Sequence, residues 1–441
     1  MRSRNALLRK DARELFGSTA FLLVLLLAGP LVGLSFIAAV RAYAEASGSG
    51  GAAALASALS PLDGLLVPTF GAYELLITFL VPFVAIRTIA NEKSSGAQEL
   101  LLQTRIPLAT QLASKLLALV LGWVLLLVPA LLALVLWRSY GGHLDAGETA
   151  NLLLGHTLRY VVTCALALAA ASMMQGAASA AIVVLTVTIG TWALDFFATG
   201  RGGAIATLAR FTPAAMLRQF ERGLLSVSVV VAALLIAAAF SAIAALFLDL
   251  RLPWRTRTLR VAVVVFLAVL MFAVIPAQLT KDVSEDRRNS FSPADERLLR
   301  SIDAPLRIAI YMAAEDPRAA DYERNVLTKL RRNVRSLHVE YPYAGRTALF
   351  DNDERYGTVE YRLRETRAVS RSTTEEIVLD EIEALAGLTP PQRGESTYPG
   401  YPLHAQPRGA GVAFYVVWPL LVLGVRWQSH RFGVRRQSRR S

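Results

Sequence analysis

Long runs of apolar residues, separated by short polar stretches, dominate this chain. A run of about twenty apolar residues is long enough to cross the ~30 Å hydrocarbon core of a bilayer as a helix. The sequence predicts eight such spans, at about 16–40, 65–86, 112–137, 153–174, 177–198, 226–249, 260–277 and 410–426. The pattern therefore predicts an all-α polytopic membrane bundle of about eight transmembrane helices.

One region, 281–408, has the composition of a water-soluble domain instead. Apolar and polar residues alternate over 305–312, which is typical of a half-buried strand. Two more strands and two helices are predicted at 336–343, 356–363, 321–335 and 374–386. Strands that alternate with helices predict a small α/β domain before the last membrane helix.

The predicted organisation has three parts. A membrane domain covers 1–280, an α/β domain covers 281–408, and a last helix with a basic tail covers 409–441. The Pro- and Gly-rich end of the α/β domain, from Leu388 to Arg408, predicts a linker back to the membrane.

The positive charge of the chain lies beside the apolar runs. The net charge is +12, yet 281–408 holds 20 Lys and Arg against 22 Asp and Glu, so the remainder carries +14. Positive charge at span ends sets membrane orientation. It predicts both termini in the cytoplasm and 281–408 outside the cytoplasm. A nucleic-acid partner is excluded, because basic residues and aromatics do not form a common patch.

No catalytic, cofactor or metal site is predicted. No stretch matches G-x-x-x-x-G-K-[ST], so the chain lacks the usual phosphate-binding loop and is not expected to hydrolyse ATP itself. The five histidines form no H-x-x-x-H or H-E-x-x-H pair, and the single Cys164 rules out a disulfide within the chain. We therefore expect a protein that is not an enzyme.

Four polar residues fall within predicted spans: Glu74, His156, Arg159 and Asp195. A charge at mid-bilayer costs about 3 kcal/mol even on the more lenient scale, so such residues are candidates for function. His156 and Arg159 are three residues apart and share a helix face. Two interpretations stay open. In the first, the residues line a polar path or pair across a moving interface. In the second, they pair statically, or Arg159 and Asp195 reach toward the head groups.

The segment Asn91–Thr104 is a short charged stretch between two apolar runs, and the orientation above places it in the cytoplasm. Its leucines and glutamates predict an amphipathic surface helix that a partner protein contacts. The segment resembles a pattern of the type-2 ABC exporter permeases, N-E-[KR]-x-x-G-[TS]-x-E-L-L-L, particularly the gliding-motility and copper-enzyme-maturation branch. The matching residues are Asn91, Glu92, Lys93, Gly96, Glu99, Leu100, Leu101 and Leu102, with Ala97 in place of Thr or Ser.

This resemblance implies a coupling helix that docks into a separate ABC ATPase subunit, which uses ATP. It implies charge contacts from Glu92 and Glu99, with Leu100 to Leu102 filling a groove of the partner. It also implies a second permease half, identical or related, and a location in the inner membrane of a bacterial cell. Stretches at 190–196 and 220–225 resemble the fifth and sixth spans of the same family.

A second resemblance begins at Asp282. The stretch Asp282–Arg288, with Phe291–Pro293 and the strand at 305–312, resembles the gliding-motility auxiliary family. Members of that family carry an extracytoplasmic domain on a membrane span. The domain here is shorter, which implies a permease fused to a truncated auxiliary domain.

The leading hypothesis is a permease subunit of an ATP-driven exporter in the lipid bilayer. An alternative is a membrane-anchored scaffolding or binding protein, in which 281–408 recognises an envelope component. A third possibility, a membrane-embedded enzyme, lacks a nucleophile or metal cluster. The sequence does not indicate the substrate.

Overall fold

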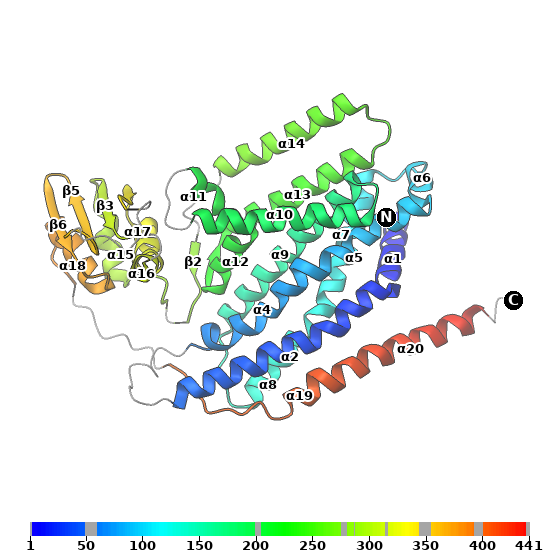
Figure 1. The fold of residues 1–441 in the computed structure, drawn as a ribbon, viewed down its shortest axis with the longest axis horizontal. Helices are drawn as coiled ribbons and strands as arrows, with labels where there is room; N and C mark the ends of the chain where they lie inside the picture. Colours follow the sequence, from blue (N-terminus) through cyan, green and yellow to red (C-terminus); the bar gives the residue numbers. More distant parts are fainter. Residues whose placement is uncertain are drawn as a thin grey trace. The chain divides into compact units, whose positions relative to one another are not determined.

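The computed structural model divides into two compact units (Figure 1). The helical unit contains Met1–Ile189, Val227–Pro276 and Tyr398–Ser441, and the sheet unit contains Gly190–Ser226 and Ala277–Thr397. The structure describes residues 2–48, 60–198, 204–274, 280–285, 287–313, 316–343, 354–391 and 400–437.

Within the described residues, seven helices are long and apolar enough to cross a membrane. They are Thr19–Gly48, Leu62–Ser94, Leu108–Ser139, Ala146–Met173, Ala177–Ala198, Val227–Leu248 and Ala410–Gln428. Each overlaps a predicted span, so the helical bundle is confirmed in this coarse form. The remaining prediction, 260–277, overlaps the helix α14 (Trp254–Val274), and its last three residues lie outside the described residues.

The spans contain several distinct helical segments. They are α2 (Thr19–Gly48); η1 (Leu62–Leu66), α4 (Val67–Leu75), η2 (Leu76–Leu80) and α5 (Val81–Ser94); α7 (Leu108–Leu126) and α8 (Val128–Ser139); α9 (Ala146–Met173); α10 (Ala177–Ala198); α13 (Val227–Leu248); and α19 (Ala410–Val412), η5 (Ala413–Val417) and α20 (Trp418–Gln437).

The second span contains two π-helical turns, η1 and η2. Pro82 at the start of α5 has no N–H to give to the carbonyl of Thr78, four residues earlier. A wider turn is one way for a helix to pass such a break, and η2 contains Thr78. The backbone of this span is therefore locally irregular just after Glu74.

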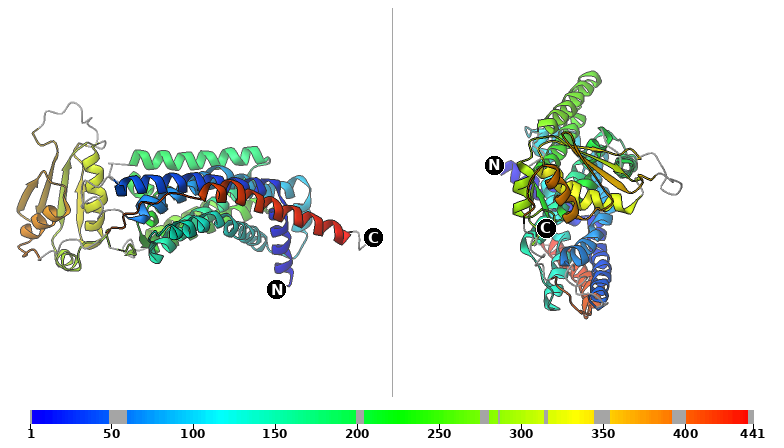
Figure 2. Two further views of the ribbon diagram at one scale, coloured as in Figure 1. Left: turned by 90° about the horizontal axis from the view of Figure 1, so that it is seen from below. Right: turned by 90° about the vertical axis from the view of Figure 1, so that its left-hand side faces the viewer.

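An additional helix, α1 (Arg2–Gly17), precedes the first span, and the sequence did not predict it. The hydroxyl oxygen of Ser18 accepts a hydrogen bond from the backbone N–H of Phe21 at 3.1 Å, which caps the start of α2. Helix α1 leaves α2 at a steep angle (Figure 2) and packs on α7 through the buried Leu7 and Leu15.

The last span packs against the first one. A Cβ on Gly29 would collide with the indole of Trp418, and a Cβ on Gly33 with the side chain of Phe414. Small residues at a four-residue spacing let two helices approach closely in a membrane. The separate C-terminal part predicted at 409–441 therefore belongs to the helical unit.

The sheet unit has a four-stranded sheet of order β4-β3-β5-β6. Its strands are β3 (Leu306–Tyr311), β4 (Leu337–Glu340), β5 (Thr358–Leu363) and β6 (Thr366–Ser370). Strand β3 is parallel to β4 and antiparallel to β5, which is antiparallel to β6. The three predicted strands are confirmed, whereas β6 was not predicted.

Helices cover one face of this sheet (Figure 2). They are α15 (Pro293–Arg300), α16 (Pro317–Tyr322) continuing through η3 (Glu323–Leu327) into α17 (Thr328–Asn333), and α18 (Glu375–Leu385). Leu306, Ile308 and Ile310 point into the shared core because alternate residues of a strand face the same side. The predicted α/β texture is thus confirmed.

The sheet unit begins earlier than the sequence predicted. Strand β1 (Leu224–Ser226) pairs antiparallel with β2 (Thr280–Asp282), with Ser226 opposite Thr280. The short helices α11 (Ala204–Ala209) and α12 (Pro213–Glu221) precede β1. The unit is therefore assembled from two stretches of chain, and the boundary placed at 281 is revised.

Candidate functional site

The predicted surface helix at Asn91–Thr104 is two elements. Helix α5 ends at Ser94, and a separate six-residue helix, α6 (Ala97–Leu102), follows. Gly96 lies between them with φ of +71°, a left-handed conformation that favours glycine and stops α5. The segment is therefore a helix end, a tight turn and a short second helix.

Helix α6 presents its central residues to the outside of the helical unit. Leu100 is 67% exposed and Glu99 is also exposed, whereas Leu101 and Leu102 are half-buried. The amide of Gln111 on α7 donates to the carbonyl of Ile106 at 3.1 Å and holds the segment after α6. Glu99 and Leu100 are therefore accessible, and the contact with a partner that the resemblance implies for them stays a prediction.

Glu92 lies inside the helical unit, which corrects the expectation that it contacts a partner directly. Its Oε1 atom is 2.5 Å from Nζ of Lys10 and 2.7 Å from Nζ of Lys115, and the Glu92 side chain is only 9% exposed. The carboxylate points inward because two ammonium groups, on α1 and on α7, neutralise it there. Glu92 is therefore an internal ion-pair residue.

The ion pairs continue around the buried Asp11 of α1. Its carboxylate accepts a hydrogen bond from the hydroxyl of Ser114 at 2.5 Å and lies 3.6 Å from Nζ of Lys115. Burial lowers the pKa of the Lys10 ammonium, but the hydrogen bond to Glu92 and the nearby carboxylates outweigh burial and raise it above its usual value. We call Lys10, Asp11, Glu92, Ser114 and Lys115 the junction cluster; it joins α1, α5 and α7.

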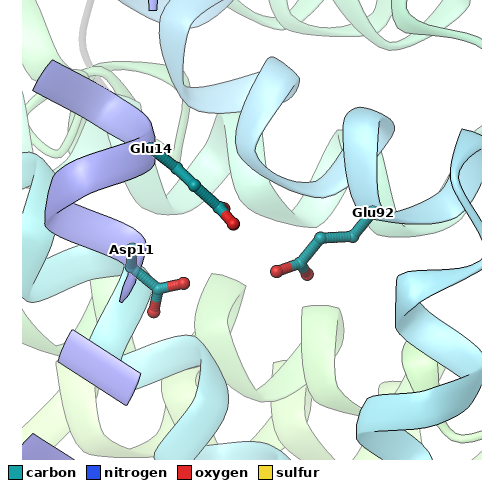
Figure 3. A group of neighbouring side chains, drawn as sticks. All are labelled: Asp11, Glu14 and Glu92. Atoms are coloured by element: carbon teal, nitrogen blue, oxygen red, sulfur yellow. The ribbon is translucent and has the colours of Figure 1, made fainter. Parts of the chain in front are cut away.

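Three carboxylates at this junction raise the question of a metal site. Oxygens of Asp11, Glu14 and Glu92 lie within 4.8 Å of one another, and Figure 3 shows them converging from α1 and α5. However, Lys10 is within 3.7 Å of all three carboxylates, and Lys115 contacts two of them. The ammonium groups already supply the positive charge, so these residues do not fit a cation.

Lys93, the neighbour of Glu92, holds a different helix. Its Nζ donates to the carbonyls of Ala171, Ser172 and Met174 at 2.7, 2.8 and 3.0 Å. Those carbonyls lie at the C-terminal end of α9, where they have no partner within the helix and where a cation is favoured. Lys93 therefore caps the C-terminal end of α9.

Two of the four intramembrane polar residues form a buried ion pair. A guanidinium nitrogen of Arg159 lies 3.0 Å from Oε2 of Glu74, which joins α9 to α4. The same nitrogen lies 3.4 Å from the hydroxyl of Thr78 in η2. Arg159 is 4% exposed at its side chain and Glu74 is 31% exposed. The pairing of Glu74 with Arg159 was one of the two interpretations left open.

His156 is fully buried beside this pair, packed between aromatic rings. Its ring centroid is 5.3 Å from that of Phe70 and 6.2 Å from that of Tyr73. Among the described residues, neither ring nitrogen has a hydrogen-bond partner. His156 shares a helix face with Arg159, as predicted, but takes no part in the ion pair.

Asp195 does not belong to this group. Its carboxylate pairs with Arg218 of α12 at 2.6 Å, and both residues belong to the sheet unit. Asp195 lies within the helix Ala177–Ala198, which is long and apolar enough to cross a membrane, so its place among the intramembrane residues stays a prediction. Its partner lies 23 residues later in the chain, beyond the end of the apolar run.

Sequence reasoning missed Lys10, Asp11 and Ser114, which complete the junction cluster. A signal was present: the first 17 residues alternate charges with leucines at helical spacing, which is typical of an amphipathic helix at a membrane surface. Lys115 was also assigned no partner, although a lysine inside an apolar run needs a carboxylate to neutralise it.

Comparison with protein-family models, with curated proteins and with solved structures finds no match to this chain. Support for a function therefore comes from the fold and the geometry of these sites.

Proposed function

We propose that this chain is the membrane-spanning permease subunit of an ATP-driven exporter, which works with a separate ATPase subunit. The observation that carries the proposal is the construction of the α5–α6 turn. Glu99 and Leu100 are exposed on α6, directly after the turn at Gly96. The end of α5, directly before that turn, contacts three other helices through Glu92 and Lys93.

Such a turn is suited to transmitting force. An exposed leucine beside an exposed carboxylate is a compact contact for a partner groove, since apolar groups at the centre of an interface carry most of its energy. A push on α6 would reach α5 through the short turn at Gly96, and the junction cluster would pass it to α1 and α7. Packed helices move between discrete arrangements, so a small displacement at α6 can move whole spans.

The pairing of β1 with β2 supports the predicted topology. Because Ser226 and Thr280 are opposite each other, the chain that leaves β1 through α13 must return to the same side before β2. If α13 crosses the membrane, α14 is the segment that crosses back. That would bring the spans to eight and would put both termini on the same side, as the charge pattern predicts.

In this proposal the partner ATPase binds and hydrolyses ATP. One such bundle rarely encloses a path, so two permease halves would assemble. The proposal needs no cofactor or metal in this chain.

The proposal is tested by co-purification of the tagged full-length chain from its native membrane. We expect an ATPase subunit to be recovered with the wild type. Leu100→Asp and Glu99→Lys should reduce its recovery about tenfold or more, since a charge in a desolvated interface costs several kcal/mol. Arg251→Glu is a matched control, because Arg251 is an exposed charge in the α13–α14 loop, on the same predicted side.

The proposal would be wrong if no ATPase is recovered with the wild type under conditions that keep the bundle folded. It would also be wrong if the two α6 variants recover the ATPase as well as the control does. A scaffolding protein would instead co-purify with envelope components through the sheet unit and would ignore both α6 changes.

A further inference from the structure

We propose that Arg159 binds the anionic head group of an amphiphilic substrate, and that Glu74 occupies this position until the substrate replaces it. This inference rests on the proposed function, because it names the class of molecule that the permease would carry.

The pair lies near the middle of two spans. Arg159 is the fourteenth of the 28 residues of α9, and Glu74 is the thirteenth of the 33 residues from Leu62 to Ser94. At this depth a charged residue is expensive and is retained for a reason. A purely structural contact between α4 and α9 would be made more cheaply by apolar side chains of similar size.

The two partners are unequally exposed, so the ion pair has an outer residue and an inner residue. The guanidinium of Arg159 is enclosed, at 4% exposure, while the Glu74 side chain is 31% exposed at the surface of the helical unit. A molecule that approaches along this face meets the carboxylate first and finds the fixed cation behind it. Glu74 therefore occupies the outer position, and Arg159 forms the inner wall.

An anion fits this site better than a cation does. A cation that paired with Glu74 would leave the buried Arg159 guanidinium without its carboxylate, and arginine stays charged because it cannot lose its proton. An anion that paired with Arg159 would leave Glu74 without its guanidinium, and a carboxylate can become neutral by taking up a proton from the solvent. Among the described residues, His156 on α9 is a titratable group close to Arg159, and Tyr73 of α4 packs against His156.

The side chains that follow Glu74 along the span favour a substrate that also carries an apolar tail. Leu75, Phe79 and Phe83 are large, exposed and spaced four residues apart along the second span, directly after Glu74. They make an exposed apolar stripe along the span that carries Glu74. A head group with one or two negative charges and an alkyl chain matches this combination.

The backbone next to Glu74 can accommodate the exchange. The π turn η2 starts two residues after Glu74, and Pro82 leaves the helix without one of its regular hydrogen bonds. π turns inside α-helices are frequent at functional sites. Thr78 in this turn already contacts Arg159, so the turn and the cation are connected.

The test uses the full-length protein in nanodiscs of zwitterionic phosphatidylcholine, with a pyrene-labelled alkyl phosphate as the probe. Dodecyl phosphate, dodecylphosphocholine and dodecyltrimethylammonium compete for the site. We expect dodecyl phosphate to compete about tenfold more strongly than the other two, since a charge-assisted hydrogen bond to arginine is involved.

Two variants of the pair separate a binding role from a structural one. Glu74→Gln should bind the alkyl phosphate several-fold more tightly, because the internal competitor is gone. The double variant Glu74→Gln/Arg159→Gln should lose about tenfold or more in affinity while it keeps the bundle folded, because no unmatched charge remains. Asp195→Asn/Arg218→Gln removes an ion pair elsewhere and should bind like the wild type.

Unchanged or weaker binding by Glu74→Gln overturns the proposal, and this variant decides the question if the double variant does not fold. Equal binding by the folded double variant, or a preference for the cationic competitor, also overturns it. These assays need no ATPase. If the chain binds alkyl phosphate as expected here but recovers no ATPase in the co-purification experiment, the permease proposal is contradicted and the binding proposal stands.

Discussion

Glu92 and Lys93 are consecutive residues at the end of α5, yet their side chains hold different helices. Glu92 accepts contacts from Lys10 of α1 and Lys115 of α7, while Lys93 donates to the last carbonyls of α9. Neighbouring residues of a helix point about 100° apart, so one helix end can reach partners on two sides. The end of α5 is therefore a branch point for three other helices.

The junction cluster makes a prediction about stability. Glu92→Leu leaves Lys115 buried without one of its two carboxylates, and we expect a loss of about 3 kcal/mol or more in the free energy of unfolding. Thermal unfolding in detergent measures it. Glu92→Gln/Lys115→Gln should recover much of the loss, since it removes both charges. A double variant no more stable than Glu92→Leu would show that charge compensation is not the cause.

The contact of Lys93 with α9 makes a second prediction. Lys93→Met should loosen the last turn of α9 by about 1 kcal/mol, because the C-terminal carbonyls lose a charged donor. Hydrogen–deuterium exchange of 167–174 should rise, while exchange at the start of α9, where Asp145 forms the N-cap, stays constant. Lys93→Arg keeps the charge and should restore part of the protection. Unchanged exchange in Lys93→Met would rule out the capping role.

The close packing of the first and last spans makes a third prediction. Gly33→Leu places a side chain where Phe414 lies, and overpacking of this kind costs about 1–3 kcal/mol. We expect a lower unfolding temperature and easier proteolysis between the sheet unit and α19. Gly424→Leu is the control, because an added Cβ there meets nothing within 4 Å. Equal effects of the two changes would contradict the packing explanation.

The sheet unit should lose stability in acid through Asp316. The Arg318 guanidinium, 2.8 Å from Oδ2, holds the pKa of the Asp316 carboxyl below its usual value, and the hydroxyl of Tyr356 also donates to it. A lowered pKa in the folded chain contributes stability that is complete above the unfolded value of about 4 and is lost as pH falls through the folded value.

We therefore expect hydrogen exchange in β5 and α16, corrected for intrinsic rates, to rise below about pH 4 in the full-length wild type. Asp316→Asn should be less protected at neutral pH and should respond less to acid. Parallel pH curves for the two proteins would show that Asp316 does not contribute.

The sequence predicted the spans because about twenty consecutive apolar residues have few other uses. It missed α1, whose apolar residues are too few and too spaced to form such a run. The expectation that Glu92 contacts a partner followed from the resemblance of Asn91–Thr104 to the permease pattern, which carries no information on the residues that pack around Glu92. Only the fold brings Lys10 and Lys115, 82 residues behind and 23 ahead, to the same carboxylate.

The ion pair of Glu74 with Arg159 shows a similar limit. Helical spacing put Arg159 and His156 on one face of their helix, but it carried no information on which partner faced each residue. The distance of 85 residues between Glu74 and Arg159 is bridged only by the packing of α9 on the second span. The partner of Asp195 could not be predicted for the same reason, since Arg218 comes from α12, a helix outside the apolar runs.

The pairing of β1 with β2 also bears on how this protein is made. The ribosome synthesises β1 before α13 and α14, and Thr280 follows Ser226 by 54 residues in the chain. The two strands can pair only after α13 and α14 have been synthesised. A change that keeps α13 and α14 from returning the chain to β1 would leave the edges of both strands unpaired, and unpaired strand edges are sites of aggregation.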